Sequence, residues 1–157
     1  MMTAIRDFFR LGFFREQEGA VLVEALVAVP FVTLFAAGIL EFGNIFWERM
    51  QIDAGLRDAG RYMARCRPTT PTYTSSCTPA TARNIAFYGT QAPAANARLR
   101  VPGWGPDPAA LTISALSANG TIVVETSHLY RTSPLFAWLG IDAITIHSSH
   151  EQRYIGW

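Results

Sequence analysis

The sequence predicts an α+β fold anchored in a membrane, in which one long N-terminal helix packs on a small antiparallel sheet of at least three strands. Three observations support this prediction. Residues 20–40 form an apolar run in which only Glu24 and Thr33 are polar. Apolar residues then recur at helical spacing, and beyond residue 110 the pattern changes to the alternation of β-strands. The helix is therefore expected to be transmembrane at its start and amphipathic afterwards.

The composition limits the size and the class of the protein. The chain has 157 residues, of which 50% are hydrophobic and 16% are charged. That length accommodates one modest domain in addition to a membrane segment. The formal net charge is only +1, which gives no support to nucleic-acid binding, so no nucleic-acid partner is expected.

The first segment, residues 1–19, carries three basic residues ahead of the apolar run: Arg6, Arg10 and Arg15. Basic residues beside a span are retained in the cytoplasm. We therefore expect a cytoplasmic N-terminus, with everything beyond residue 40 on the outer side of the membrane.

Residues 20–40 are expected to form a transmembrane helix. At about 1.5 Å per residue, roughly 21 helical residues span about 30 Å, the thickness of the hydrocarbon core. Pro30 lies inside this run, and membrane helices tolerate such a proline. Two alternatives are weaker. A buried core helix rarely needs so long an apolar surface on all sides, and the apolar region of a secretory signal peptide has only about 7–15 residues.

The helix is expected to continue over residues 41–67 with two distinct faces. Apolar residues recur at helical spacing and make one stripe: Ile52, Leu56, Ala59 and Met63. Arginines follow an i, i+4 rhythm on the opposite side, which is typical of a solvated face: Arg57, Arg61 and Arg65. Asp53 stands one turn before Arg57 and is expected to form an ion pair with it. Pro68 is expected to end the helix.

Residues 68–157 are expected to form the extracytoplasmic sheet domain. A short amphipathic helix is predicted at residues 81–90, followed by a loop. Three β-type runs come next: residues 111–118, 121–129 and 143–149. The first two flank Asn119-Gly120, a strong signal for a two-residue hairpin turn. A sheet with one apolar face needs a partner layer, and the amphipathic half of the long helix supplies it.

Cys66 and Cys77 flank a polar segment rich in proline and threonine. Their spacing fits no tetrahedral zinc pattern, and no histidine lies nearby in the sequence. Two readings stay open, a pair of free thiols and a disulfide. If this part of the chain lies outside the cytoplasm, the oxidising environment favours the disulfide.

The start of the apolar run resembles the processing site of type IV pilin-like precursors. In the stretch GAVLVE, a glycine (Gly19), a small residue (Ala20) and a glutamate (Glu24) head an apolar helix. Most classical pilins have a methylated phenylalanine after the glycine, so Ala20 departs from their pattern. A small residue at this position is more similar to the Tad branch.

The resemblance extends downstream, where residues 18–64 are similar along their whole length to the TadE-like family of pseudopilins. The specific parts are Glu41-Phe42-Gly43 and an arginine-acid-x-x-arginine-tyrosine motif. That motif occupies residues 57–62 and includes Arg57, Arg61 and Tyr62. A later stretch, residues 128–140, resembles the family only loosely.

This resemblance implies processing by a membrane aspartic peptidase, the prepilin peptidase, which would cleave after Gly19. Cleavage would free the α-amine of Ala20, and Glu24 lies about one helical turn away. The carboxylate would then neutralise the amine of its own chain or of a neighbouring subunit, which offsets the desolvation of both charges. The alternative is a glutamate that stays hydrated at the membrane boundary.

Two functional hypotheses follow. The first is a structural component of a Tad-type (Flp) pilus or a related secretion machinery, with pilins, pseudopilins and Tad assembly proteins as partners. It implies a single-pass protein of the bacterial inner membrane with a periplasmic domain, and leaves incorporation into an extracellular pilus open. The second is a membrane-anchored binding domain that never polymerises.

Catalysis is the weakest hypothesis. The histidines are His128, His147 and His150, and the last two would point to opposite faces of a strand. Residues 68–157 contain no nucleophile elbow, phosphate loop or paired carboxylates. Each histidine is expected to be a surface strand residue, and we expect no metal, cofactor or small-molecule substrate.

Overall fold

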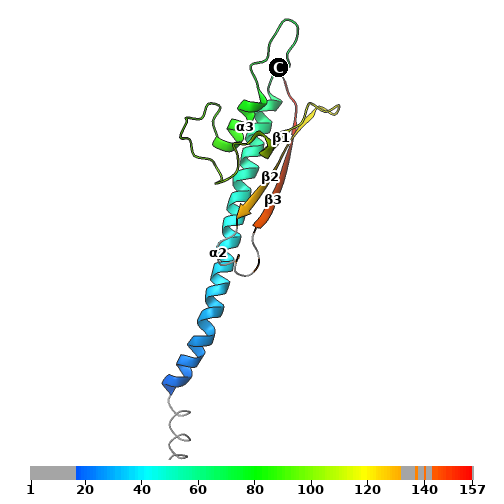
Figure 1. Cartoon of the computed structure of the whole chain (residues 1–157). Coiled ribbons are helices and arrows are strands. Elements are labelled where there is room, and N and C mark those ends of the chain that lie inside the picture. Colours follow the sequence, from blue (N-terminus) through cyan, green and yellow to red (C-terminus); the bar gives the residue numbers. More distant parts are fainter. Residues whose placement is uncertain (1–16, 132–136, 138–139, 141–142, 157) are drawn as a thin grey trace, which may run out of the picture. The chain divides into compact units, whose positions relative to one another are not determined.

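The computed structural model describes residues 17–131, 137, 140 and 143–156 (Figure 1). In chain order the elements are helix α2 (Gln17–Ala64), helix α3 (Pro79–Tyr88), the 3₁₀ turn η1 (Pro108–Ala110) and strands β1 (Leu111–Ile113), β2 (Thr121–Arg131) and β3 (Ala143–Arg153). A long apolar helix followed by an antiparallel sheet of three strands confirms the predicted α+β class. Most of the predicted leader and part of residues 128–140 lie outside the described residues.

The chain divides into two compact units, Met1–Phe42 and Gly43–Trp157. The boundary falls inside α2, so one helix contributes to both units. In the first unit, α2 is apolar on all sides and contains Pro30. Among the described residues, α2 is the one helix that is long and apolar enough to cross a membrane. No residue in its most apolar stretch of 18 residues is buried.

In the second unit, α2 supplies one layer of a closed core. The predicted apolar stripe is buried as expected: Ile52, Leu56 and Ala59 are fully buried, and Met63 packs against them. The same cluster includes Phe87 from α3 and Val124 from β2. The arginines of the opposite face are exposed, which agrees with the predicted solvated side: Arg57, Arg61 and Arg65.

Two glycines allow neighbours to approach α2 closely. A Cβ atom placed on Gly55 would lie 2.7 Å from the carbonyl oxygen of Ala86 and 2.8 Å from the ring of Trp104. A Cβ on Gly60 would lie 3.2 Å from the ring of His150 on β3. The helix therefore packs against α3 and Trp104 through Gly55, and against the sheet through Gly60.

The sheet has the order β1-β2-β3, with both pairs antiparallel. Along β2, buried and exposed residues alternate, as the period of two requires. The third strand extends to Arg153, further than the predicted residues 143–149. Its last residues are polar and half-exposed, so their sequence gives no apolar alternation from which a strand can be predicted.

The turn between β1 and β2 differs from the prediction of a two-residue hairpin. Residues 118–120 form the loop, closed by the Ser117 N–H, which donates to the Thr121 carbonyl, and by the Gly120 N–H, which donates to Ser117. Gly120 has φ 71°, the left-handed conformation that such three-residue loops require. β1 ends at Ile113 because the Ser114 hydroxyl accepts the Val123 N–H and competes with the backbone ladder.

Helix α3 lies close to the predicted residues 81–90, and local sequence explains its ends. The Thr78 hydroxyl accepts the N–H of Thr81 at the start, and Pro79 occupies the first turn, where its missing N–H costs nothing. Gly89, with φ 76°, ends the helix in the left-handed conformation.

Helix α2 ends at Ala64, a few residues before the predicted boundary at residue 67. The C-terminal segment of the chain satisfies the carbonyls exposed there, because the Ile155 N–H donates to Ala64 and the Tyr154 hydroxyl donates to Cys66. The end of the chain thus holds the end of the helix in place.

Candidate functional site

The predicted processing residues lie near the start of α2. Gly19, Ala20 and Glu24 are all exposed, and a Cβ atom on Gly19 would meet no atom within 4 Å. Nothing else in the described first unit packs on this turn of the helix. Its side chains are therefore accessible to a peptidase or to another subunit, and their predicted roles stay predictions.

The motif Glu41-Phe42-Gly43 combines three different environments. Glu41 is only 4% exposed, whereas the ring of Phe42 is 58% exposed. A Cβ on Gly43 would meet open space, so this glycine is not required by a contact within the chain. The motif thus presents an aromatic ring and a small residue on the helix surface.

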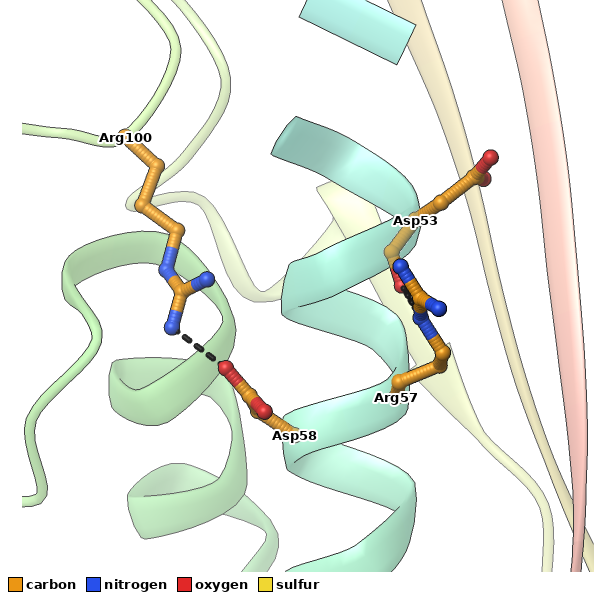
Figure 2. Close-up of polar contacts among 4 residues, drawn as sticks. All are labelled: Asp53, Arg57, Asp58 and Arg100. Carbon is orange, nitrogen blue, oxygen red and sulfur yellow. Dashed lines mark hydrogen bonds and ion pairs between the residues drawn. The ribbon is translucent and has the colours of Figure 1, made fainter. Parts of the chain in front are cut away.

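The second motif contains one correction to the predicted ion pairs. Arg57 does not pair with the Asp53 carboxylate: its Nε donates to the Asp53 backbone carbonyl at 3.2 Å. Figure 2 shows the Asp53 carboxylate turned away from the guanidinium. That carboxylate instead accepts a hydrogen bond from the Ser148 hydroxyl on β3. The Asp53 carboxylate can bond Ser148 because Ser148 lies on the face of β3 that packs towards α2.

An ion pair that sequence reasoning missed ties the loop after α3 to α2. An Arg100 nitrogen lies 2.6 Å from an oxygen of Asp58, as Figure 2 shows. The partners are separated by 42 residues, so no local spacing signals the pair. Of the other motif residues, Arg61 is exposed and Tyr62 packs at the margin of the core.

His128 is not the surface residue that the sequence predicts. Its side chain is 5% exposed, and its Nε2 lies 3.3 Å from the Glu48 carboxylate on α2. Burial raises the pKa of the Glu48 carboxyl above its ordinary value, and the neighbouring His128 opposes part of that shift. The period of β2 places His128 on the inner face, where it needs a polar partner.

The other two histidines agree better with the prediction. His147 is exposed and His150 is half-buried, on opposite faces of β3. The described residues contain no group of three or more His, Cys, Asp or Glu side chains that could hold a metal ion.

Cys66 and Cys77 form a disulfide, with Cα atoms 5.9 Å apart. This confirms the second of the two readings of the cysteines. The bond closes the loop that follows α2 and joins it to the residue before the Thr78 cap of α3. A structural disulfide is typical of an oxidising compartment.

Comparison with known proteins adds one finding. Residues 19–61 match the family model described as TadE-like protein, which is the family that the sequence resembles. The matched segment contains the predicted processing residues from Gly19 onwards and both motifs up to Arg61. No curated protein and no solved structure matches the chain. The family is pilus-associated and structural, and the apolar helix within the match suggests a membrane-anchored protein.

Proposed function

We propose that the protein is a TadE-like minor pilin or pseudopilin, inserted in the bacterial inner membrane through α2 and working in the assembly of a Tad-type pilus. The observation that carries this proposal is the match over residues 19–61, because it falls on the apolar helix and its motifs. The C-terminal domain is periplasmic, and its role is structural rather than catalytic. The partners are the membrane, a prepilin peptidase and other Tad pilins and assembly proteins.

The exposed surface of the apolar helix supports this function. Large apolar side chains from Val21 to Leu40 are roughly half to three-quarters exposed, and the chain itself does not cover them. A surface of this kind is stable in lipid or against the helices of other subunits. The Cys66–Cys77 disulfide supports a location of the second unit outside the cytoplasm.

The test of processing uses Gly19→Leu and the intact mass of the membrane-extracted protein. In cells with an active prepilin peptidase, the wild-type chain should lack residues 1–19, whereas Gly19→Leu should keep them. The variant tests recognition and not folding, because a side chain at Gly19 has open space.

The matched control is Gly38→Leu, in the same helix and also in open space. It should be cleaved as the wild type is. A wild-type protein that retains its leader would contradict the pseudopilin function and leave the second hypothesis, an anchored domain that does not polymerise.

The test of Glu24 separates charge from packing, because glutamine is nearly isosteric with glutamate. If Glu24 neutralises the amine of Ala20 in a neighbouring subunit, Glu24→Gln should insert normally but lose assembly. Removing one partner of a buried ion pair costs about 3–5 kcal/mol, a factor of a hundred or more in association. The measurement is co-purification with pilin partners at equal membrane abundance. Undiminished assembly would mean that Glu24 is a hydrated boundary residue.

A further inference from the structure

A polar groove lies between α2 and β3, entirely within the second unit. Its cavity has a volume of about 460 Å³. Arg49, Asp53 and Arg57 line it from the helix, spaced four residues apart and so on one face. Residues 147–150 line it from β3. Neither the processing residues nor the motif Glu41-Phe42-Gly43 contributes to this groove.

Two arginine side chains in the groove have guanidinium nitrogens that are free to bind a ligand. Arg57 uses its Nε on the Asp53 carbonyl, and the Asp53 carboxylate is engaged by Ser148. Within the described ranges, the guanidinium of Arg49 has no hydrogen bond or ion pair, and the terminal nitrogens of Arg57 have none either. Both arginines are exposed. Guanidinium groups bind carboxylates through two parallel hydrogen bonds, so the groove is suited to an acidic ligand.

Among the described strands, none pairs with β3 on the side that faces away from β2, so this edge is open there. β3 is the last strand in the order β1-β2-β3, and its residues from Ala143 to Arg153 pair with β2 in unbroken register. The Tyr154 N–H donates to the Gly120 carbonyl, in continuation of that register. Because bonded and non-bonded positions alternate, the backbone groups of the odd-numbered residues of β3, such as His147 and Ser149, point away from β2.

An open edge of this length is a template for another strand. We propose that an extended acidic segment of a partner protein adds to β3 as a fourth strand, with its carboxylates on Arg49 and Arg57. The two arginines are eight residues apart, about 12 Å along a helix. Acidic side chains four residues apart on an extended chain share one face and are separated by about 13 Å. The two spacings agree, so one strand can reach both guanidinium groups.

A second copy of this chain suits the groove less well than an acidic partner. Pairing of β3 with its own copy would bring Arg49 and Arg57 of both copies to one interface, where like charges repel. The inference does not depend on the pilus assignment, because it uses only the groove and the edge of the sheet. An experiment can therefore contradict removal of the leader without contradicting strand addition at β3, and the reverse also holds.

The experiment uses the full-length protein in detergent micelles and a fluorescein-labelled peptide whose anisotropy reports binding. The peptide alternates threonine and valine and carries two glutamates four residues apart. It should bind, and the same peptide with lysines in place of the glutamates should not. A third peptide keeps the glutamates but is N-methylated at alternate residues, which blocks the hydrogen bonds of an added strand, and it should also fail to bind.

The variant that tests the groove is Arg49→Gln/Arg57→Gln. Each lost charge-assisted hydrogen bond is worth about a tenfold loss of affinity or more, so the double variant should bind the acidic peptide at least tenfold more weakly. The matched control is Arg61→Gln/Arg65→Gln, which removes the same charge from α2. Both control positions are exposed and lie beside another pocket, so affinity should not change.

Three outcomes would overturn the proposal. The acidic peptide does not bind, or it binds both double variants equally, or the N-methylated peptide binds as well as its parent. The last result would show an anion site without strand addition. A positive result is completed by hydrogen exchange, because the peptide should slow the amides of His147 and Ser149 at the edge of β3.

Discussion

The two halves of α2 share one helical geometry but differ in what covers their apolar side chains. In the first unit Phe31 and Phe35 are 71% and 74% exposed. In the second unit Ile52 and Leu56 are completely buried among α3, the sheet and the loop residue Trp104. The large apolar side chains of the first half are therefore left exposed by the chain itself, whereas Ile52 and Leu56 of the second half are covered by their own chain.

The difference shows that the hydrophobicity of a helix alone does not predict whether its own domain covers its apolar side chains. The second half has polar residues on its outer side and glycines where neighbours approach, and these features belong to a helix that docks on its own domain. The first half lacks such a polar side. We call residues 43–64, the part of α2 in the second unit, the docked half. If the two halves are independent, substitutions in the docked half should lower the free energy of unfolding of the second unit without preventing membrane insertion.

The largest expected effect comes from Trp104→Ala. Trp104 is 1% exposed, meets Phe87 edge to face at 5.1 Å and donates its indole N–H to the Thr126 hydroxyl at 2.9 Å. Losing such a side chain costs about 3–5 kcal/mol in the free energy of unfolding. Denaturant titration of the detergent-solubilised protein, followed by near-ultraviolet circular dichroism, measures the loss.

Trp47→Ala is the control, because Trp47 lies on α2 and is 51% exposed. It should change the free energy of unfolding far less. Membrane-fraction abundance of Trp104→Ala should stay close to that of the wild type under conditions that limit proteolysis. A variant that fails to insert would show that the two halves of α2 are not independent.

Removal of the disulfide should have the next largest effect. Replacing both Cys66 and Cys77 by serine frees a loop of sequence separation 11, which costs about 3 kcal/mol in the chain-entropy account. The loss should appear in the unfolding of the second unit, with insertion unchanged.

Thiol alkylation of the native wild-type protein provides the accompanying check. Neither cysteine should be labelled before reduction, and both should be labelled afterwards. Two thiols that react without reduction would contradict the bond and weaken the assignment of this unit to an oxidising compartment.

Patterns within one helix or one strand were sufficient to predict much of the fold. The apolar run predicts a span, and the spacing of Ile52, Leu56 and Ala59 predicts the docked face, because both patterns repeat along a single element. The alternation along β2 predicts a strand for the same reason. The sequence favoured the Cys66–Cys77 bond over free thiols only on the condition that this part of the chain lies outside the cytoplasm, and the structure shows the bond.

Long-range pairings could not be predicted in this way. Asp53 has a local candidate in Arg57 but bonds Ser148, and His128 is paired with Glu48, because docking of the helix on the sheet brings these residues together. Trp104 lies in a segment whose prolines and glycines predict a loop, and it is buried because Gly55 leaves room for its ring. Of the candidate site, the sequence supplied the motif residues but not the groove at β3.

A smaller effect is expected from alanine at two glycines of α2. At Gly55 the new methyl group would lie 2.7 Å from the Ala86 carbonyl oxygen, which is backbone and cannot move freely. Overpacking typically costs about 1–3 kcal/mol, and this exceeds the gain of up to about 1 kcal/mol in helix propensity. Gly55→Ala should therefore lower the free energy of unfolding.

Gly43→Ala is the matched substitution at a glycine with open space around it. It should leave the free energy of unfolding unchanged or raise it by up to about 1 kcal/mol. The same denaturant titration measures both variants. If both variants lost the same free energy of unfolding, close packing at Gly55 would not be the cause of the loss.

The smallest effect concerns Glu48 and the pH dependence of the second unit. Burial raises the pKa of this carboxyl in the folded chain above the ordinary value of 4.5, which applies to the unfolded chain. Between these two pKa values the folded chain binds more protons than the unfolded chain. The contribution of Glu48 to the free energy of unfolding is therefore greatest below pH 4.5, and it falls as the pH rises through the folded pKa.

Glu48→Gln tests this sign, because glutamine keeps a polar side chain beside His128 but does not titrate. The free energy of unfolding should be measured for both proteins at several pH values from about 4 upwards. The wild-type value minus the variant value should decrease as the pH rises through the folded pKa of Glu48. A difference that increases with pH would mean that attraction to His128 outweighs desolvation, so that the carboxylate stabilises the docked half of α2 in its charged form.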